Sequence, residues 1–131
     1  MRRRHLLATP LLIAAASWPA QAADDLLMVI YIGGKDCGPC VLWRTCSYPK
    51  WRASPEYGRV RYVDIEPDSL RDAYKSAHWP DGLGSIRSAV SRIRATPRFV
   101  LARGRKVILT DIGGAGWQNV YAATRHALGT G

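Results

Sequence analysis

An apolar run that ends shortly before a cysteine pair is the feature that most constrains the fold of this chain. Residues 26–32, "LLMVIYI", are apolar throughout, and two glycines follow them. A strand that is covered on both faces of a sheet has this pattern. Cys37 and Cys40 come next, separated by Gly38 and Pro39. We expect a helix to begin at the pair and to reach about residue 48. The cysteines therefore fall where a buried strand gives way to a helix.

The rest of the chain continues this alternation of strands and helices. We expect strands at 60–65, 99–102 and 107–112, and helices from 68–69 through "SLRDAYKSAHW", at 85–94 and at 117–128. A strand, helix, strand order predicts parallel neighbours joined by a right-handed crossover. The last two strands, joined by only a few residues, predict an antiparallel hairpin. The sequence therefore predicts one α/β domain with helices on both faces of a mixed sheet.

The first 22 residues have the order of a secretory signal peptide. Three arginines, Arg2 to Arg4, precede an apolar run at 6–16, and Ala20-Gln21-Ala22 forms an A-x-A cleavage site. We predict cleavage after Ala22 and a mature domain of residues 23–131, exported to the periplasm without stable insertion in the membrane. An apolar run this short does not span a bilayer, which needs about 20 residues. An uncleaved anchor remains the alternative, and both the general and the twin-arginine export routes stay open.

Charge and cysteine count narrow the function classes. The formal net charge is +9, and removal of the three leader arginines lowers it. Such a balance is typical of proteins that bind nucleic acid, anionic lipid or an acidic partner, or of a merely solvated cationic surface. We expect no nucleic-acid partner for an exported protein. Disulfides persist outside the cytoplasm, and three cysteines allow one pair and one leftover thiol.

The spacing of the pair suits redox chemistry. The start of a helix carries partial positive charge, which lowers the pKa of a thiol there and makes it a nucleophile. Two intervening residues let Cys40 reach Cys37 and release a mixed disulfide. Zinc is one alternative, but only Cys46, His78 and His126 remain as ligands, without a second CxxC, so we expect no metal. A purely structural disulfide is another, although so short a loop stabilises little.

Three stretches together resemble the thioredoxin family. They are "CGPC" at 37–40, "EYGRVRYVDIEPDSL" at 56–70 and "IRATPRFVLARGRKVILTDIGG" at 93–114, and the likeness extends over most of residues 26–128. The resemblance implies a minimal four-stranded mixed sheet with one helical insertion before a cis-proline. It also implies that Thr96–Pro97 is that cis peptide, facing the cysteines. The backbone of Thr96 would pair with a substrate strand, and Pro97, Gly38 and Pro39 would complete the binding surface.

Departures from the family pattern concern the residues beside the pair. Tyr31 stands where the family usually has a buried acid, and Asp36 where it usually has tryptophan. Proton transfer from Cys40 would then need water or a neighbour such as Lys35; Lys35 favours the Cys37 thiolate and Asp36 opposes it. We therefore assign Lys35, Asp36 and Tyr31 to proton transfer or pKa tuning.

Three further features lie outside the motif itself. Trp79, in the insertion, is expected to cover the core, with a partner-recognition lip as the alternative. Cys46 is expected on the buried face of its helix, with a regulatory or intermolecular thiol as the alternative. Arg92, Arg94 and Arg98 flank Thr96–Pro97 and either steer an acidic partner or only keep the edge soluble.

The function that follows is thiol:disulfide exchange with partner proteins, most consistent with a reductase or isomerase. Strongly oxidising relatives commonly place histidine between the cysteines, and this chain has none there. A disulfide oxidase and a non-catalytic thioredoxin-like binding module remain alternatives. No nicotinamide or flavin fingerprint is present. We therefore expect no cofactor beyond the redox-active disulfide Cys37–Cys40, and a membrane thiol-relay protein as electron donor.

Overall fold

The computed structural model describes residues 25–131, so the predicted signal peptide and its cleavage site lie outside the described residues. One sheet contains the four strands β1 (Leu27–Ile32), β2 (Arg61–Ile65), β3 (Arg98–Arg103) and β4 (Lys106–Ile112), in the order β2-β1-β3-β4. β1 is parallel to β2 and antiparallel to β3, which forms an antiparallel hairpin with β4. The predicted four-stranded mixed sheet is confirmed.

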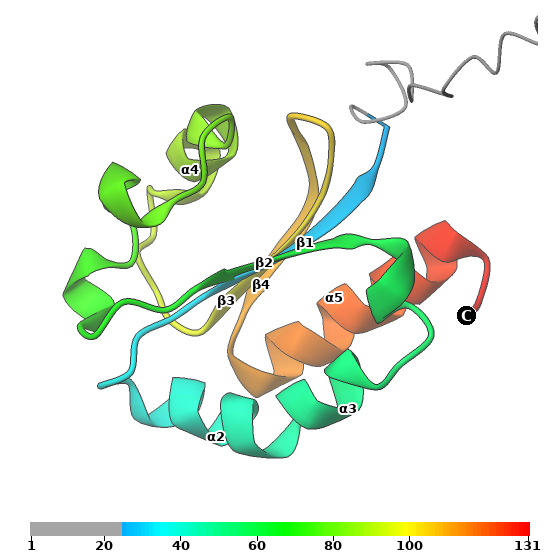
Figure 1. The fold of residues 1–131 in the computed structure, drawn as a ribbon, viewed down its shortest axis with the longest axis horizontal. Helices are drawn as coiled ribbons and strands as arrows, with labels where there is room; N and C mark the ends of the chain where they lie inside the picture. The colour runs from blue at the N-terminus through cyan, green and yellow to red at the C-terminus, as the bar shows by residue number, and fades with distance from the viewer. Residues whose placement is uncertain (1–24) are drawn as a thin grey trace, which may run out of the picture.

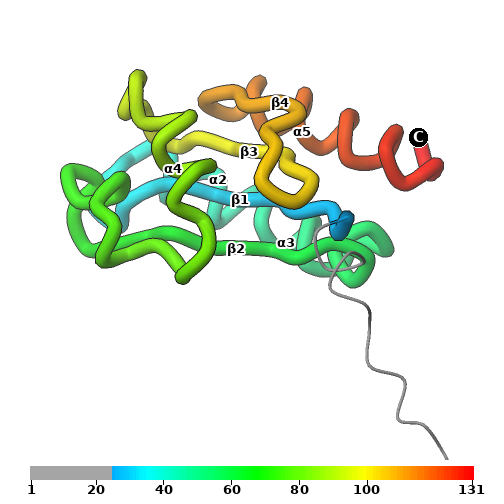
Figure 2. The backbone as a smooth tube through the Cα atoms, turned by 90° about the horizontal axis from the view of Figure 1, so that it is seen from above, coloured from blue at the N-terminus to red at the C-terminus, as the bar shows by residue number. Residues whose placement is uncertain are grey.

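Helices cover both faces of this sheet, as predicted. α2 (Gly38–Cys46), α3 (Tyr48–Arg52) and α5 (Gly113–Leu128) lie on one face, and α4 (Gly84–Val90) lies on the other (Figure 1). Seen from above, α4 and the turns around it lie in front of the strands, and α2 and α3 lie behind them (Figure 2). No helix within residues 25–131 combines the length and the apolar character needed to cross a membrane.

The side chains of β1 point alternately into two cores, which explains why the whole strand is apolar. Met28, Ile30 and Ile32 join the core under α4, whereas Leu27, Val29 and Tyr31 join the core under α2 and α5. Successive side chains of a strand point to opposite faces, so a strand with two cores needs apolar residues at every position. This central strand ends at the turn that carries the cysteine pair.

The prediction of a helix from residues 68–69 onward is wrong. The segment instead contains two short 3-10 turns, Leu70–Asp72 and Ser76–His78. The backbone carbonyl of Ala73 accepts a hydrogen bond from Trp79 Nε1 at 2.8 Å, and Lys75 between the turns is extended. Trp79 is only 8% exposed within the core under α4, which confirms core cover. Burying this indole outweighs the helical periodicity of the segment.

Two helix boundaries also differ from expectation. α4 ends at Val90 rather than near residue 94, so residues 91–97 form a connection that leads into β3. α5 begins at Gly113, directly after β4, rather than at Trp117. Gly113 has a φ of +77°, a left-handed conformation that glycine adopts at little steric cost. It turns the chain from strand to helix in one residue.

Candidate functional site

Cys37 lies at the end of the turn after β1 and caps α2. Its backbone is extended, and its Sγ accepts a hydrogen bond from the backbone N–H of Cys40 at 3.3 Å. Pro39, in the first turn of α2, has no N–H to leave unpaired. The Cys37 sulfur therefore lies where the free amides and partial positive charge of a helix start favour a thiolate.

The two cysteines of the pair are joined by a disulfide, with their Cα atoms 5.2 Å apart. Cys37 is 4% exposed and Cys40 only 1%, while Gly38 and Pro39 between them are exposed. Cys37 is thus the outer sulfur and Cys40 the inner one. A partner disulfide approaching over Gly38 and Pro39 meets Cys37 first.

Thr96 and Pro97 end the connection that leads into β3, and Thr96 reaches the pair from there. The Thr96–Pro97 peptide bond is cis, and Thr96 Oγ1 donates a hydrogen bond to Cys37 Sγ at 3.4 Å. The Pro97 carbonyl accepts a hydrogen bond from the Gly113 N–H at 2.9 Å, which ties this segment to the start of α5. The structure thus brings Thr96 onto the outer sulfur from 59 residues away. Sequence reasoning assigned Thr96 only a backbone role and missed its hydroxyl.

Tyr31 lies beneath the pair and is fully buried. Its ring stacks on Trp43 with centroids 4.5 Å apart, and its hydroxyl has no hydrogen-bond partner among the described residues. A methyl group placed on Gly33 would collide with the Tyr31 hydroxyl and lie 2.9 Å from Cys40 Sγ. The hydroxyl and the inner sulfur therefore border the same small space.

The protonation of Tyr31 limits what it can do there. Burial, followed by the negative charge of Glu66, raises the pKa of Tyr31. The phenol therefore stays protonated at neutral pH, because the neutral form is favoured away from water. It can donate a hydrogen bond to a sulfur, but it is a poor proton acceptor for Cys40.

Lys35 and Asp36 bind a neighbouring segment rather than the sulfurs. Lys35 Nζ lies 3.1 Å from Asp68 Oδ1 in an exposed ion pair. Asp36 Oδ1 accepts a hydrogen bond from the Leu70 N–H at 2.6 Å. Neither side chain hydrogen-bonds a cysteine sulfur within the described part of the chain. Their effect on the Cys37 thiolate stays a prediction that acts through space.

The expectation that Cys46 is buried is wrong. Cys46 is a free, exposed cysteine, at the last residue of α2. Six residues at 3.6 per turn rotate it by about 240° from Cys40, so it leaves the inward face that Cys40 and Trp43 occupy. It borders a hollow of about 270 Å³ lined by Pro39, Leu42, Trp43, Cys46, Ser47 and Gly114.

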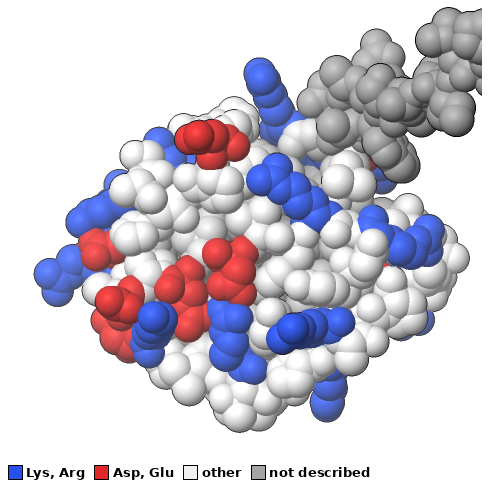
Figure 3. Space-filling model, viewed as in Figure 1, with Lys and Arg blue, Asp and Glu red and all other residues white. Residues whose placement is uncertain are grey.

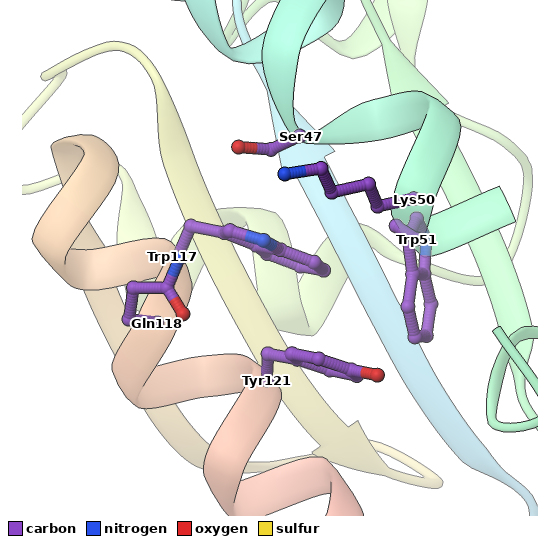
Figure 4. Close-up of a pocket in the computed structure, with 6 residues that line it drawn as sticks. All are labelled: Ser47, Lys50, Trp51, Trp117, Gln118 and Tyr121. Atoms are coloured by element: carbon purple, nitrogen blue, oxygen red, sulfur yellow. The ribbon is translucent and has the colours of Figure 1, made fainter.

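A second hollow lies away from the pair, between α3 and α5. It has a volume of about 190 Å³, and three of its six lining residues are aromatic. Trp117 and Tyr121 of α5 lie parallel there, opposite Trp51 and Lys50 of α3 (Figure 4). None of the predicted site residues lines it. Among residues 25–131, no group of three or more histidine, cysteine or acidic side chains is arranged to hold a metal ion.

Comparison with known proteins gives a consistent answer at the level of structure. No protein-family model and no curated protein sequence matches the chain. A Malassezia sympodialis thioredoxin is 25% identical, with 81% of each chain covered and a TM-score of 0.53. The periplasmic thioredoxin SoxS of Paracoccus pantotrophus is 19% identical, with 79% of this chain and 97% of that chain covered and a TM-score of 0.54.

A third solved structure adds to this agreement. Mitochondrial thioredoxin 3 of Saccharomyces cerevisiae is 21% identical, with 81% of this chain and 83% of that chain covered and a TM-score of 0.51. The shared fold and the bonded pair at the start of α2 support thiol–disulfide oxidoreductase chemistry in general. The chain therefore has the thioredoxin fold. The solved proteins that it matches are thioredoxins, as its motifs predicted.

Proposed function

We propose that this protein is an exported, periplasmic thiol:disulfide oxidoreductase that reduces or rearranges disulfides in partner proteins. The observation that carries the proposal is the position of Cys37 Sγ. It caps α2, accepts a hydrogen bond from the Cys40 amide, and is bonded to the Cys40 sulfur. A helix-capping thiolate with a resolving thiol beside it has the two groups that disulfide exchange needs.

The exchange runs in two displacements. In the reduced protein, the Cys37 thiolate attacks one sulfur of a partner disulfide, forms a mixed disulfide, and releases the other partner sulfur as a thiolate. Cys40 then gives its proton to water or to the released partner thiolate, and its sulfur attacks Cys37 Sγ. This forms the Cys37–Cys40 disulfide and releases the second partner thiolate, so two electrons pass to the partner. A dithiol donor must reverse these steps before the next cycle.

One feature supports electron flow toward the partner, and two others support the location. Gly38 and Pro39 place no histidine between the cysteines, which resembles the reducing members of the family. The signal-peptide pattern at residues 1–22 and the likeness to a periplasmic thioredoxin support an exported location. Outside the cytoplasm a reductase needs electrons brought across the membrane, and a membrane thiol-relay protein is the proposed donor.

The proposal is tested by trapping. In a Cys46→Ser background, a Cys40→Ser variant expressed in the exporting cell should hold partner proteins on Cys37 as mixed disulfides, because the resolving sulfur is missing. The matched control adds Cys37→Ser and should hold none. Reducible adducts in the first variant alone are expected. Equal adducts in both variants, or adducts in neither, contradict the proposed function.

Direction and class need two further readouts. Equilibration with reduced and oxidised glutathione separates a reductase from an oxidase, because a tenfold change in the equilibrium corresponds to about 30 mV. A Cys37→Ser protein that still binds its partner, in a cell where no adduct forms on the Cys40→Ser protein, would instead indicate a binding module.

A further inference from the structure

Arg98 is a buried arginine beside the active site. Sequence analysis placed it among the surface arginines that flank Thr96–Pro97, but it is only 8% exposed. Within the described residues it forms no ion pair with a carboxylate. Its guanidinium donates instead to the Val90 carbonyl at 3.0 Å, to the Ile93 carbonyl, and through Nε to Thr110 Oγ1 at 2.8 Å.

Tyr74 holds the same connection from another side. Its hydroxyl donates a hydrogen bond to the Ala95 carbonyl at 2.7 Å. Val90, Ile93 and Ala95 all belong to the end of α4 and the chain that follows it. Their carbonyls are thus held by donors from Arg98 and Tyr74, one residue before Thr96 reaches Cys37 Sγ. The connection is preorganised beside the outer sulfur, which lowers the entropy lost when a partner binds.

Because these carbonyls are hydrogen-bonded within the protein, the connection presents mainly side chains to a partner. Ile93 is 61% exposed, and the arginines on either side of it, Arg92 and Arg94, are exposed as well. We call residues 92–94 the reading loop. Ile93 precedes Thr96 by three residues, so its Cα lies within about 11 Å of the Thr96 Cα. A partner bound at Cys37 therefore comes close to this loop.

The charges of the reading loop are not neutralised within the described residues. Arg92 and Arg94 form no ion pair there, whereas Lys35 pairs with Asp68 and Lys75 pairs with Asp72. On the face shown in Figure 3, most acidic side chains gather in one area where basic ones lie among them, and basic groups dominate elsewhere. Two unpaired cations around an exposed apolar side chain suit an acidic partner segment.

We propose that the reading loop selects substrates whose disulfide is flanked by acidic residues around an apolar one. The inference rests on the proposed function and adds the substrate class to it. Ile93 contacts the apolar residue, and Arg92 and Arg94 attract the acidic ones. Arg98 and Tyr74 are positioning residues that hold the loop in place.

The test uses two disulfide peptides that differ only in the residues flanking their apolar position, acidic in one and basic in the other. The rate constant for reduction of each peptide by the reduced protein is measured at low ionic strength. The wild-type protein should prefer the acidic peptide. Arg92→Glu with Arg94→Glu should lower the acidic-to-basic rate ratio at least about tenfold, because charges at the edge of a docking surface act mainly on association.

The matched control reverses the same charge elsewhere. Arg105→Glu with Lys106→Glu changes the net charge equally at the far end of β3, about 17 Å away along the strand, at exposed positions. This variant should keep the wild-type ratio. Tyr74→Phe should raise KM for the acidic peptide and leave the equilibrium with glutathione unchanged, because it frees the loop without touching the cysteines.

The outcomes separate the two proposals. An unchanged ratio in the loop variant, or an equal fall in the control variant, overturns the inference and leaves the arginines as solvated surface charge. If the wild-type protein equilibrates with glutathione but reduces neither peptide, the proposed function fails instead. Arg92→Gln with Arg94→Gln should give an intermediate ratio, and a ratio equal to that of the wild type contradicts the inference.

Discussion

The Tyr31 hydroxyl and the Cys40 sulfur show how the fold distinguishes the two cysteines. Cys37 has the Cys40 amide and the Thr96 hydroxyl as hydrogen-bond donors. Cys40 is the more buried of the two and borders the space that the unpartnered Tyr31 hydroxyl faces. The outer sulfur is thus prepared for attack and the inner one is kept from water.

Tyr31→Phe should shift the pair toward its disulfide. Reduction turns Cys40 into a better hydrogen-bond partner for the Tyr31 hydroxyl, which has none in the oxidised protein. We expect a hydrogen bond between the Tyr31 hydroxyl and Cys40 to form on reduction and to favour the reduced form in the wild type. One such bond is worth about 1 kcal/mol, or about a fivefold change in equilibrium. The oxidised fraction should therefore rise about fivefold relative to the reduced one at a fixed glutathione ratio.

The control for this substitution is Tyr121→Phe. The Tyr121 hydroxyl bonds weakly to Glu56 at 3.4 Å on the far part of α5. Its loss should leave the glutathione equilibrium as in the wild type. An unchanged equilibrium in Tyr31→Phe would show that the hydroxyl does not act on Cys40.

Gly33→Ala should destabilise the protein. A methyl group there would overlap the Tyr31 ring and lie 2.9 Å from Cys40 Sγ, and the Tyr31 ring is itself packed against Trp43 and Phe99. Overpacking of this kind lowers the free energy of unfolding by about 1–3 kcal/mol, which urea denaturation measures. Gly114→Ala is the control, because nothing lies within 4 Å of its Cβ position and alanine favours a helix. Equal stability in both variants would contradict the close contact.

Residue-scale prediction from the sequence succeeded where chemistry is local. The CGPC spacing after a buried run indicated which sulfurs bond. It could not indicate that Thr96 Oγ1 contacts Cys37 or that Arg98 is buried, because both depend on contacts between distant segments. The exposure of Cys46 follows from helical rotation away from Cys40, and the family resemblance led to the wrong face. An arginine directly after the cis-proline motif gave no periodic signal of burial.

At the scale of elements, strands were predicted more accurately than short helices. β1 needs apolar residues on both faces, so its sequence has one interpretation. The segment at 68–79 satisfies a helical pattern equally well, but Trp79 and Tyr74 both pack into the core under α4. The Trp79 indole takes the Ala73 carbonyl, and two 3-10 turns result. Competition of this kind between a side chain and a backbone ladder is not visible in periodicity.

Glu56 joins the turn before β2 to the end of α5. Its carboxylate accepts a hydrogen bond from Thr130 Oγ1 at 3.1 Å and pairs with Arg125 Nε at 3.3 Å. A backbone hydrogen bond at Glu56 itself is the main cause that lowers the pKa of this carboxyl, and the Thr130 and Arg125 contacts add to it. The charged form is therefore the one that stabilises the folded protein.

The sign of the pH effect follows from the lowered pKa. The contribution of Glu56 is complete above its ordinary pKa of 4.5 and is lost as the pH falls through the folded value. Glu56→Gln should lower stability by about 1–2 kcal/mol at pH 7 and flatten the fall in stability below pH 4.5, as followed by urea denaturation at several pH values. A variant whose acid sensitivity equals that of the wild type would contradict this role.

At the scale of the whole molecule, the order of strands and helices was enough to predict the fold. A parallel crossover followed by a hairpin, with a nucleophilic pair at the carboxyl end of the central strand, leaves few arrangements of four strands. The insertion with α4 covers the second face and leads into the connection that reaches Thr96. It therefore links the core of one face to the geometry of the site.

The reactivity of Cys37 as a function of pH tests the central claim most directly. In the reduced protein with Cys46→Ser, the rate of alkylation of Cys37 by iodoacetamide should rise with a midpoint below about pH 7.5, because the start of α2 stabilises the thiolate. A midpoint near pH 8.5, the value of an ordinary free thiol, would contradict the account.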